Sequence, residues 1–262
     1  MPLVSIILTV YNGEKFILET INSVLNQTYK NLELIIINDF SKDNSENIIK
    51  SFNDDRIIYI KNNNNLNIVE SRNIGIKKST GKYLCFLDHD DIFMEDKIKK
   101  QVEFLEKNTD YGLVGCNIIN VDENNNIIGK NIVPETDEII RNRLLRSSQF
   151  ACGAVLIRKD ILDIVGFLDN KFIKTDDYDL WLKIGTISKM HNLQEFLFKY
   201  RYHLNNTSNK SHKEMIIKSI RLCIKYRNYY PNFMKSIILW FSYLLIPKVI
   251  SKKILSYIKF NK

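Results

Sequence analysis

The 262-residue chain lacks the glycine-rich loops that most often bind nucleotides. The turn after its first apolar segment, Val10–Lys15 (VYNGEK), contains a single glycine, so it does not match the G-x-G-x-x-G pattern of dinucleotide-binding folds. No G-x-x-x-x-G-K-[ST] sequence occurs either. If the chain binds a nucleotide, its phosphates must therefore be held by side chains and a metal ion.

The sequence also lacks the cysteine and leader patterns of zinc-binding and secreted proteins. Its four cysteines are scattered and lie mostly in apolar segments: Cys85, Cys116, Cys152 and Cys223. Because they do not have the spacing of a zinc site, we expect free, buried thiols in a reducing compartment. The first residues enter an apolar segment without a basic leader, which is not the pattern of a secretory signal. A cytoplasmic location is therefore expected.

Acidic residues are scarce in the C-terminal fifth of the chain. Residues 210–262 contain twelve lysines and arginines and a single acid, Glu214. The other residues carry a small excess of acids, so the net charge of +8 arises entirely from the C-terminal segment. Such asymmetry indicates an anionic partner for this segment, either a nucleic acid or a membrane surface.

What the chain does contain is an alternation of strand-like and helix-like segments. Apolar, β-branched segments predict buried strands at residues 3–10, 32–37, 57–60 and 83–87. Helical periodicity predicts helices at residues 16–26 and 68–78, and the turn at 38–43 opens another. Strands that alternate with helices form βαβ units. The sequence therefore predicts the α/β class, with a mostly parallel, Rossmann-like sheet flanked by helices.

After residue 110 the alternation is less regular. We expect strands at residues 113–121, 154–157 and 196–202, and helices at 94–108 and 176–184. Trp181 belongs to the apolar side of the last of these helices. We expect it in the core, with a platform for an acceptor as the alternative.

Three acids follow the fourth predicted strand within four residues: Asp88, Asp90 and Asp91. Clustered carboxylates repel one another unless a cation or a shared proton relieves them. Mg²⁺ is usually held by one or two carboxylates together with substrate phosphates, so the cluster is typical of a metal–diphosphate site. The alternative is a turn, because aspartate also bonds its own backbone and caps helices, as Asp91 could do for the helix at 94–108.

Polar residues follow three of the predicted strands, at Thr9–Asn12, Asn38–Asp39 and Asp88–Asp91. Ligands of open α/β sheets bind outside the carboxyl ends of the strands. Three such segments converging on one edge favour a binding site over isolated turns.

In several segments the chain resembles glycosyltransferase family 2, and these segments follow that family's order over roughly residues 3–208. They are Val4–Asn12, Gln27–Tyr29 leading to Ile37–Asp39, Arg72–Gly75, Gly81–Leu84 running into Asp88–Asp91, Thr175–Trp181, and Tyr200–His203. The resemblance implies a GT-A fold. Residues 1–210 would form the catalytic domain, with a nucleotide-sugar-binding half (1–110) and an acceptor half (111–210). Residues 211–262 would form a helical, basic and apolar extension.

The resemblance also implies how the donor is held. Thr9, Tyr11 and Asp39 match positions that hold the nucleotide base, usually uracil. Arg72 matches a position near the base or the diphosphate. For Asp39 the alternative is a turn residue that bonds its own backbone.

Four further residues match the metal and catalytic positions of the family. Asp88 and Asp90 match its DxD motif, with Asp90 the favoured direct ligand of Mn²⁺ or Mg²⁺. His203 matches a further metal contact, although a lone histidine at a strand end is usually structural. Asp177 matches the catalytic base, although an acid at the start of a helix also favours the helix dipole.

These residue types suit the chemistry that the resemblance implies. A divalent ion stabilises the charge that develops on a departing nucleoside diphosphate. A carboxylate removes the proton of the attacking acceptor hydroxyl. In an inverting displacement this base lies on the sugar face opposite the leaving group, so Asp177 suits the role and Asp91 does not.

The chain departs from the family pattern at three places. Phe40 occupies a position where the family commonly has glycine, which would alter the turn after Asp39. Asp176 replaces the usual glutamate. No Gln-x-x-Arg-Trp motif follows Trp181, so transfer of one sugar or a few is favoured over processive polymer synthesis.

The C-terminal extension combines apolar and basic residues. Residues 212–230 predict a helix that Pro231 ends, and the apolar segment Ile237–Ile246 leads into a second apolar and basic stretch. Ten apolar residues are too few to span a bilayer, which needs about 20. Aromatic and aliphatic residues flanked by lysines suit a helix lying in the surface of an anionic membrane. The alternative is a helix packed on the catalytic domain or in a homodimer interface. Nucleic-acid binding is not expected.

Together these observations predict an inverting, metal-dependent glycosyltransferase that uses a nucleoside-diphosphate sugar, most simply a UDP-hexose or UDP-N-acetylhexosamine. Its acceptor would be a hydroxyl of a glycan or a lipid-linked sugar in bacterial surface polysaccharide synthesis. The enzyme would be peripheral on the cytoplasmic face of the membrane. The alternatives are a catalytically silent nucleotide-sugar-binding scaffold and a sugar nucleotidyltransferase, although the latter typically needs a glycine- and basic-rich first loop.

Overall fold

The strands expected in the first 90 residues form one parallel sheet. The computed structural model describes residues 1–203, 206 and 211–245. In it β1 (Val4–Val10) lies between β2 (Leu32–Asn38) and β4 (Tyr83–Asp88), and β3 (Ile57–Lys61) extends the sheet beyond β2. All three pairings are parallel. The predicted α/β class is confirmed.

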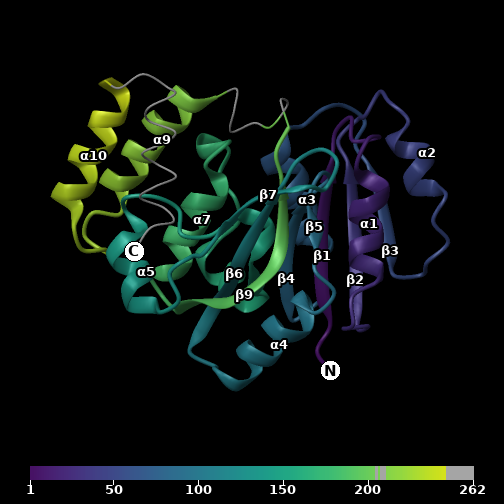
Figure 1. Cartoon of the computed structure of the whole chain (residues 1–262), viewed down its shortest axis with the longest axis horizontal. Helices are drawn as coiled ribbons and strands as arrows, with labels where there is room; N and C mark the ends of the chain where they lie inside the picture. Colours follow the sequence, from purple (N-terminus) through teal and green to yellow (C-terminus); the bar gives the residue numbers. More distant parts are fainter. Residues whose placement is uncertain (204–205, 207–210, 246–262) are drawn as a thin grey trace.

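The second half of the sheet mixes strand directions. Its strands are β5 (Ile92–Phe93), β6 (Tyr111–Val121), β7 (Ile127–Asn131), β8 (Leu156–Arg158) and β9 (Lys189–Arg201). Within the described residues the strand order is β3-β2-β1-β4-β8-β6-β9-β5, with β7 beside β6 (Figure 1). The ladder of β6 and β9 is parallel and long, whereas the antiparallel ladders are short. The sheet is therefore mostly parallel, as predicted.

The register of the strands brings their polar carboxyl ends to one edge. Thr9 of β1 is paired with Asp88 of β4, and Val10 is paired with Asn38 of β2. At the end of β9, Arg201 is paired with Val121. The predicted convergence of the polar segments is confirmed.

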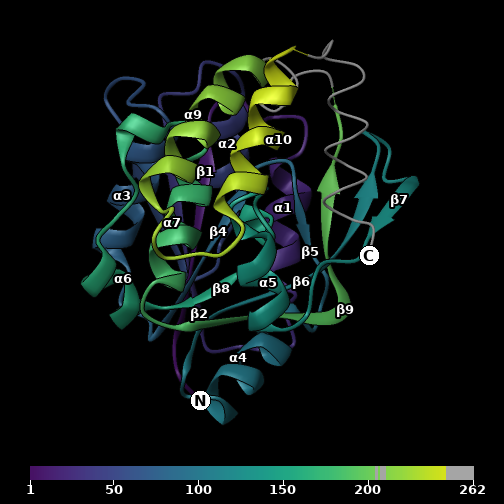
Figure 2. The same cartoon turned by 90° about the vertical axis from the view of Figure 1, so that its left-hand side faces the viewer.

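Helices cover both faces of the sheet (Figures 1 and 2). Apolar residues of β1 and β4 alternate between two cores, so that Ile7 and Phe86 belong to one and Leu8 and Leu87 to the other. The core of Leu8 includes residues of α1 (Ile17–Leu25), α2 (Ser45–Lys50) and α4 (Lys97–Lys107). The core of Ile7 includes residues of α3 (Ile68–Lys78), α5 (Asp137–Leu144), α6 (Lys159–Val165) and α7 (Asp176–Gly185).

Two expectations about the interior are confirmed. Trp181 is fully buried in the core of Ile7. The four cysteines are free thiols, and all but the half-buried Cys152 are buried.

Some element boundaries differ from the expected ones. β9 begins at Lys189, seven residues before the expected start, because its first part lies beside the start of β6 despite several polar residues. β8 is shorter than expected, since a 3-10 turn at Cys152–Ala154 precedes it. The sequence pattern missed the short helices α5 and α6.

The C-terminal helices α9 (His212–Lys225) and α10 (Phe233–Leu245) form a hairpin over α7 and α5 (Figure 2). Trp240 Nε1 donates to Leu145 O at 2.8 Å, and Tyr230 OH donates to Leu182 O at 2.7 Å. None of the helices in the described ranges is long and apolar enough to cross a membrane. The expected apolar and basic stretch after Leu245 lies outside the described residues.

The outer face of α10 is apolar and exposed. We call this surface the α10 stripe; it consists of Met234, Ile238, Phe241 and Leu245, which are 51–87% exposed. The inner face of the same helix contains the buried Ser236, Trp240 and Tyr243. Among the described residues, α10 therefore packs on the body of the protein by its inner face.

Candidate active site

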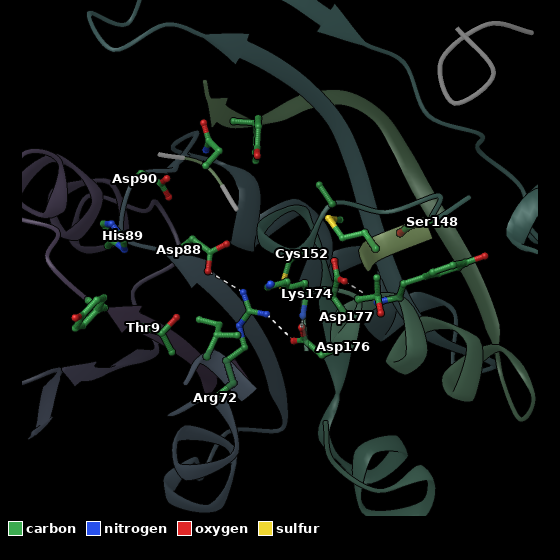
Figure 3. A pocket seen from close by; sticks show the side chains of 18 of the residues that line it. Thr9, Arg72, Asp88, His89, Asp90, Ser148, Cys152, Lys174, Asp176 and Asp177 are labelled. Carbon is green, nitrogen blue, oxygen red and sulfur yellow. Dashed lines mark hydrogen bonds and ion pairs between the residues drawn. The ribbon is translucent and has the colours of Figure 1, made fainter. Parts of the chain in front are cut away.

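A cavity of about 1280 Å³ opens at the carboxyl edge of the sheet (Figure 3). All eight site residues expected from the sequence line it: Thr9, Tyr11, Asp39, Arg72, Asp88, Asp90, Asp177 and His203. They come from four strand ends and two helices, so the fold itself assembles the site.

Arg72 joins the two sides of this cavity. One guanidinium nitrogen lies 2.7 Å from Asp88 Oδ1 and another lies 2.9 Å from Asp176 Oδ2. Figure 3 shows Arg72 between these two carboxylates. Arg72 and Asp176 are buried, whereas the Asp88 side chain is 36% exposed. The planar guanidinium therefore ties the end of β4 to the start of α7.

His203, just after β9, meets the loop after β4. Its Nε2 lies 2.7 Å from Asp90 Oδ2, and both side chains are largely buried. Burial alone would raise the pKa of Asp90, but the hydrogen bond from His203 and the charges of His89 and His203 hold that pKa below its ordinary value. Asp90 is therefore favoured as a carboxylate.

The expectation that Asp91 caps the following helix is wrong. The residue before α4 is Asp96, and Asp91 is instead buried, with Oδ1 accepting a hydrogen bond from the Arg201 backbone N–H at 2.9 Å. Burial, together with Asp90 and Asp88, raises the pKa of Asp91 well above its ordinary value. Arg201 also donates from Nε to Asp90 O at 2.8 Å. The end of β9 thus holds the acidic loop after β4 (Asp88–Asp91) in place. The sequence pattern did not predict these contacts.

Asp39 organises the opposite wall. Its carboxylate accepts hydrogen bonds from Asn62 Nδ2 and from the backbone N–H groups of Leu66 and Asn67, at 2.8–3.1 Å. It therefore does not bond its own turn, as the alternative interpretation proposed, but orders the loop at 62–67. Nearby, Thr9 Oγ1 is buried without a hydrogen-bond partner in the described chain, and Tyr11 is 47% exposed.

Two backbone features allow the loops to approach one another. Phe40 has a φ of 66°, the left-handed conformation that glycine adopts most easily. The turn after Asp39 therefore keeps the conformation typical of glycine despite the phenylalanine. At Gly13, an added Cβ would lie 2.6 Å from the His89 ring, so glycine lets the first loop lie against the acidic loop.

Asp177 lies in the first turn of α7, across the cavity from Asp90 (Figure 3). Its Oδ1 accepts from the Tyr178 backbone N–H at 2.7 Å, and its side chain is half-buried. Lys174 precedes it with a φ of 76°, and its side chain pairs with Glu214 of α9. Asp177 therefore borders the cavity, and the segment just before it contacts the C-terminal hairpin.

Several residues that line the cavity carry no local sequence signal. Cys152 comes from the 3-10 turn before β8, and burial raises the pKa of its thiol well above the ordinary value. The hairpin contributes His212, Met215, Ile216, Ser219 and Trp240. Their places depend on packing between distant segments, which periodicity does not reveal.

The residues present suit a divalent cation only in part. Within the described ranges no group of three His, Cys, Asp or Glu side chains is arranged to hold a metal ion. Asp90 and His203 supply an oxygen and a nitrogen at one place. Mg²⁺ commonly completes its coordination with substrate phosphates and water, so such a pair fits a cation that binds together with a diphosphate.

Relatives with curated descriptions resemble most of the chain. An uncharacterized glycosyltransferase of Rickettsia prowazekii is 37% identical over 215 residues, which cover 79% of this chain and 66% of that protein. The chain thus spans about two thirds of the length of that relative. The Escherichia coli UDP-Glc:alpha-D-GlcNAc-diphosphoundecaprenol beta-1,3-glucosyltransferase WfgD is 35% identical over 217 residues, covering 81% of this chain and 82% of WfgD.

Solved structures share the fold at low identity. S. aureus TarS 1-349 in complex with UDP-GlcNAc gives a TM-score of 0.73 at 16% identity, over 92% of this chain and 71% of that one. The mannosyltransferase PcManGT from Pyrobaculum calidifontis in complex with GDP-Man and Mn²⁺ gives 0.69 at 15% identity, over 98% and 74%. The expected GT-A fold is confirmed.

The family can be assigned from the sequence match itself. A family model described as "Glycosyl transferase family 2" matches residues 5–166, more than half of the chain. This range contains β1, β2 and β4, whose carboxyl ends border the cavity. The match agrees with the motifs, the fold and the curated relatives: the chain belongs to glycosyltransferase family 2.

Proposed function

We propose that the protein is an inverting, metal-dependent glycosyltransferase. It transfers a sugar from a UDP-hexose or UDP-N-acetylhexosamine to a hydroxyl of a glycan or lipid-linked acceptor in the synthesis of a bacterial surface polysaccharide. The observation that carries this proposal is one cavity lined by Asp90, His203 and Asp177, in which His203 contacts Asp90 and Arg72 joins Asp88 to Asp176.

The donor side of the cavity suits a nucleoside diphosphate. Thr9, with its unpaired buried hydroxyl, and Tyr11 border the place proposed for the base, beside the loop that Asp39 orders. Asp90 and His203, with Asp88 beside them, would hold Mn²⁺ or Mg²⁺. A divalent ion there supplies positive charge to the oxygens of the departing diphosphate.

Asp177 is the proposed general base. It takes the proton from the acceptor hydroxyl while that oxygen forms a bond to the anomeric carbon. The bond between the anomeric carbon and the phosphate oxygen breaks, and the nucleoside diphosphate leaves with the electron pair. Asp177 and Asp90 lie on opposite sides of the cavity (Figure 3), which supports attack and departure on opposite faces of the sugar and therefore inversion of the anomeric centre.

The relatives and the hairpin support a proposal for the acceptor and the location. The names of WfgD and of a second Escherichia coli relative, WfaP (34% identical over 222 residues), specify a GlcNAc-diphosphoundecaprenol acceptor. A lipid-linked acceptor of this class would require work at a membrane surface. We propose that the protein is peripheral on the cytoplasmic face and that its C-terminal extension contacts the membrane there.

The test is transfer measured with UDP-glucose, UDP-N-acetylglucosamine and GDP-mannose in the presence of Mn²⁺, with a sugar-diphosphate lipid as the acceptor. We expect Asp90→Ala to lose donor binding, and Asp177→Ala to keep donor binding but lose transfer. Asp163→Asn, on the exposed side of α6, is the matched control. The anomeric configuration of the product, read by NMR, tests inversion.

Other results would favour other functions. Donor binding without transfer to any acceptor by the wild type would indicate a scaffold. Release of pyrophosphate from a nucleoside triphosphate and a sugar 1-phosphate would indicate a nucleotidyltransferase. Full transfer by Asp177→Ala would overturn the assignment of the base.

A further inference from the structure

Two arginines at the end of α5 have no acidic partner among the residues that the structure describes. Arg143 and Arg146 are three residues apart, and the Arg146 backbone N–H donates to Arg143 O at 2.9 Å. In the described part of the chain neither guanidinium forms an ion pair, whereas Arg141 on the same helix pairs with Asp137. After Glu214 the sequence contains no aspartate or glutamate, so the C-terminal segment offers these arginines no acidic side chain.

One side-chain atom of Arg146 and one of the neighbouring Tyr243 are buried. Arg146 Nε and Tyr243 OH both lack a hydrogen-bond partner in the described chain. Tyr243 is only 2% exposed, and it lies on the inner face of α10, one turn after Trp240, which is anchored to Leu145 O. Buried donors without partners are rare in folded proteins and need an explanation.

The charges around Arg146 and Tyr243 also favour a bound anion. Burial lowers the pKa of Arg146, and the like charge of Arg143 lowers it further. Burial raises the pKa of Tyr243 to about 12, although Arg146 opposes the change, so the phenol keeps its proton and remains a donor. An anion bound among these three groups would relieve the repulsion and accept the unpaired hydrogens.

The position of the cluster defines what kind of anion can reach it. On one side Ser147, Ser148 and Trp240 line the cavity of the candidate active site. On the outer face of α10, opposite Tyr243, the α10 stripe presents apolar side chains to the outside. A ligand that touches both therefore needs a charged group next to an apolar tail.

We propose that Arg143, Arg146 and Tyr243 form a binding site for a phosphate group carried by a lipid. Guanidinium groups bind phosphate through paired, charge-assisted hydrogen bonds, and a tyrosine hydroxyl supplies a further donor. The lipid is either the isoprenoid diphosphate of the acceptor or a phospholipid of the membrane. The first of these sources rests on the proposed function.

Direct binding tests the site without catalysis. Farnesyl diphosphate and farnesol, titrated in detergent by calorimetry, differ only in the diphosphate. Sedimentation with vesicles of phosphatidylglycerol, against phosphatidylcholine, tests the phospholipid. The variants are Arg146→Gln and Tyr243→Phe, and the latter removes one oxygen and keeps the ring. Arg221→Gln, an exposed arginine of α9, controls for net charge, and thermal unfolding checks that each variant is folded.

If the acceptor diphosphate is the ligand, the wild type will prefer farnesyl diphosphate to farnesol, and Arg146→Gln will weaken that binding roughly tenfold or more. Tyr243→Phe will weaken it less, and Arg221→Gln will leave it unchanged. If the phospholipid is the ligand, the same variants will reduce sedimentation with phosphatidylglycerol instead.

The proposal is overturned if the wild type shows no preference in either arm, or if neither Arg146→Gln nor Tyr243→Phe reduces it. A wild type that transfers no sugar yet shows these binding differences would reject the proposed function and retain the phosphate site. Sugar transfer by a wild type that shows no binding preference in either arm would retain the proposed function and reject the phosphate site.

Discussion

The imidazole of His203 lies 2.7 Å from the carboxylate of Asp90, although 113 positions separate the two residues. If this pair holds the cation, losing the imidazole weakens metal binding more than it weakens folding. We expect His203→Ala to reduce the affinity for Mn²⁺, measured by calorimetry in the presence of UDP, by roughly 10- to 100-fold. His191→Ala is the control, because that ring is stacked on Phe104 outside the cavity. Equal Mn²⁺ affinity in both variants would contradict the assignment.

Replacement of Arg72 will expose its buried partner. Arg72→Met leaves Asp176 buried without its cation, and removing one partner of a buried ion pair typically costs about 3 kcal/mol of stability. Arg72→Lys will recover only part of this loss, since an ammonium cannot bond both carboxylates in a planar, bidentate manner. Urea unfolding measures both variants. In a double-mutant cycle with Asp176→Leu, simple additivity of the two effects would refute the coupling.

The fully buried Asp179 fastens the hairpin to α7. Its Oδ1 accepts from Lys225 Nζ at 2.8 Å and from Tyr226 OH at 2.9 Å. We expect Asp179→Asn to lower the free energy that protects the α9 amides from hydrogen exchange by about 2 kcal/mol, while β1 and β4 keep their protection. Asp163→Asn should have no effect. A uniform loss of protection throughout the protein would show that Asp179 acts on global stability instead.

The burial of Lys97 leads us to expect that the free energy of unfolding depends on pH. Its amine is fully buried, donates to Gln101 Oε1 at 2.9 Å, and forms no ion pair with a carboxylate within the described residues. Burial lowers its pKa below the ordinary value of 10.5. Between the lowered value and 10.5 the unfolded chain binds more protons than the folded one, so stability gains from this group as the pH rises. Measured by urea unfolding between pH 7 and pH 10, the wild type should gain stability relative to Lys97→Met. If the free energies of unfolding of the two proteins change in parallel with pH, the lowered pKa of Lys97 is contradicted.

If the protein binds a membrane as proposed, the α10 stripe is the surface that we expect to contact it. Phe241→Glu should lower the affinity for phosphatidylglycerol vesicles about tenfold or more, because an apolar ring leaves the interface and a negative charge enters it. Ile164→Glu, at an isoleucine of α6 that is 70% exposed, should leave the affinity unchanged. If Phe241→Glu instead converts a dimer into a monomer in analytical ultracentrifugation with no effect on vesicle binding, the stripe is a homodimer interface.

The sequence predicts the part of the site at the ends of β1, β2 and β4 well, because the information there is local. β-Branched segments define β1, β2 and β4, and the polar residues that follow each strand must meet once the strands pair in parallel. Asp88 and Asp90 could therefore be placed in the cavity from spacing alone. The family resemblance added Asp177 and His203, which no local pattern connects to the acids.

The rest of the site depends on contacts between distant segments. Asp91 looked like a helix cap because aspartate is common there, yet the N–H of Arg201 holds it in the interior. The contribution of the C-terminal hairpin (α9 and α10) to the cavity was not predicted for a similar reason. An amphipathic sequence does not indicate which surface the apolar face of its helix will cover. Charge and periodicity indicated a surface helix, but packing on α5 and α7 determines which of its faces remains outside.

The position of the C-terminal hairpin (α9 and α10) has a consequence for how such enzymes can diversify. The hairpin follows β9, and the family match ends at residue 166, before the hairpin begins. Its principal anchors reach α5 and α7 and leave the pairing of β1 with β4 untouched. We therefore expect residues 211–245 to be exchangeable as a unit: grafting the corresponding helices of a relative onto this body would change the far end of the cavity and leave the residues at the ends of β1 and β4 in place.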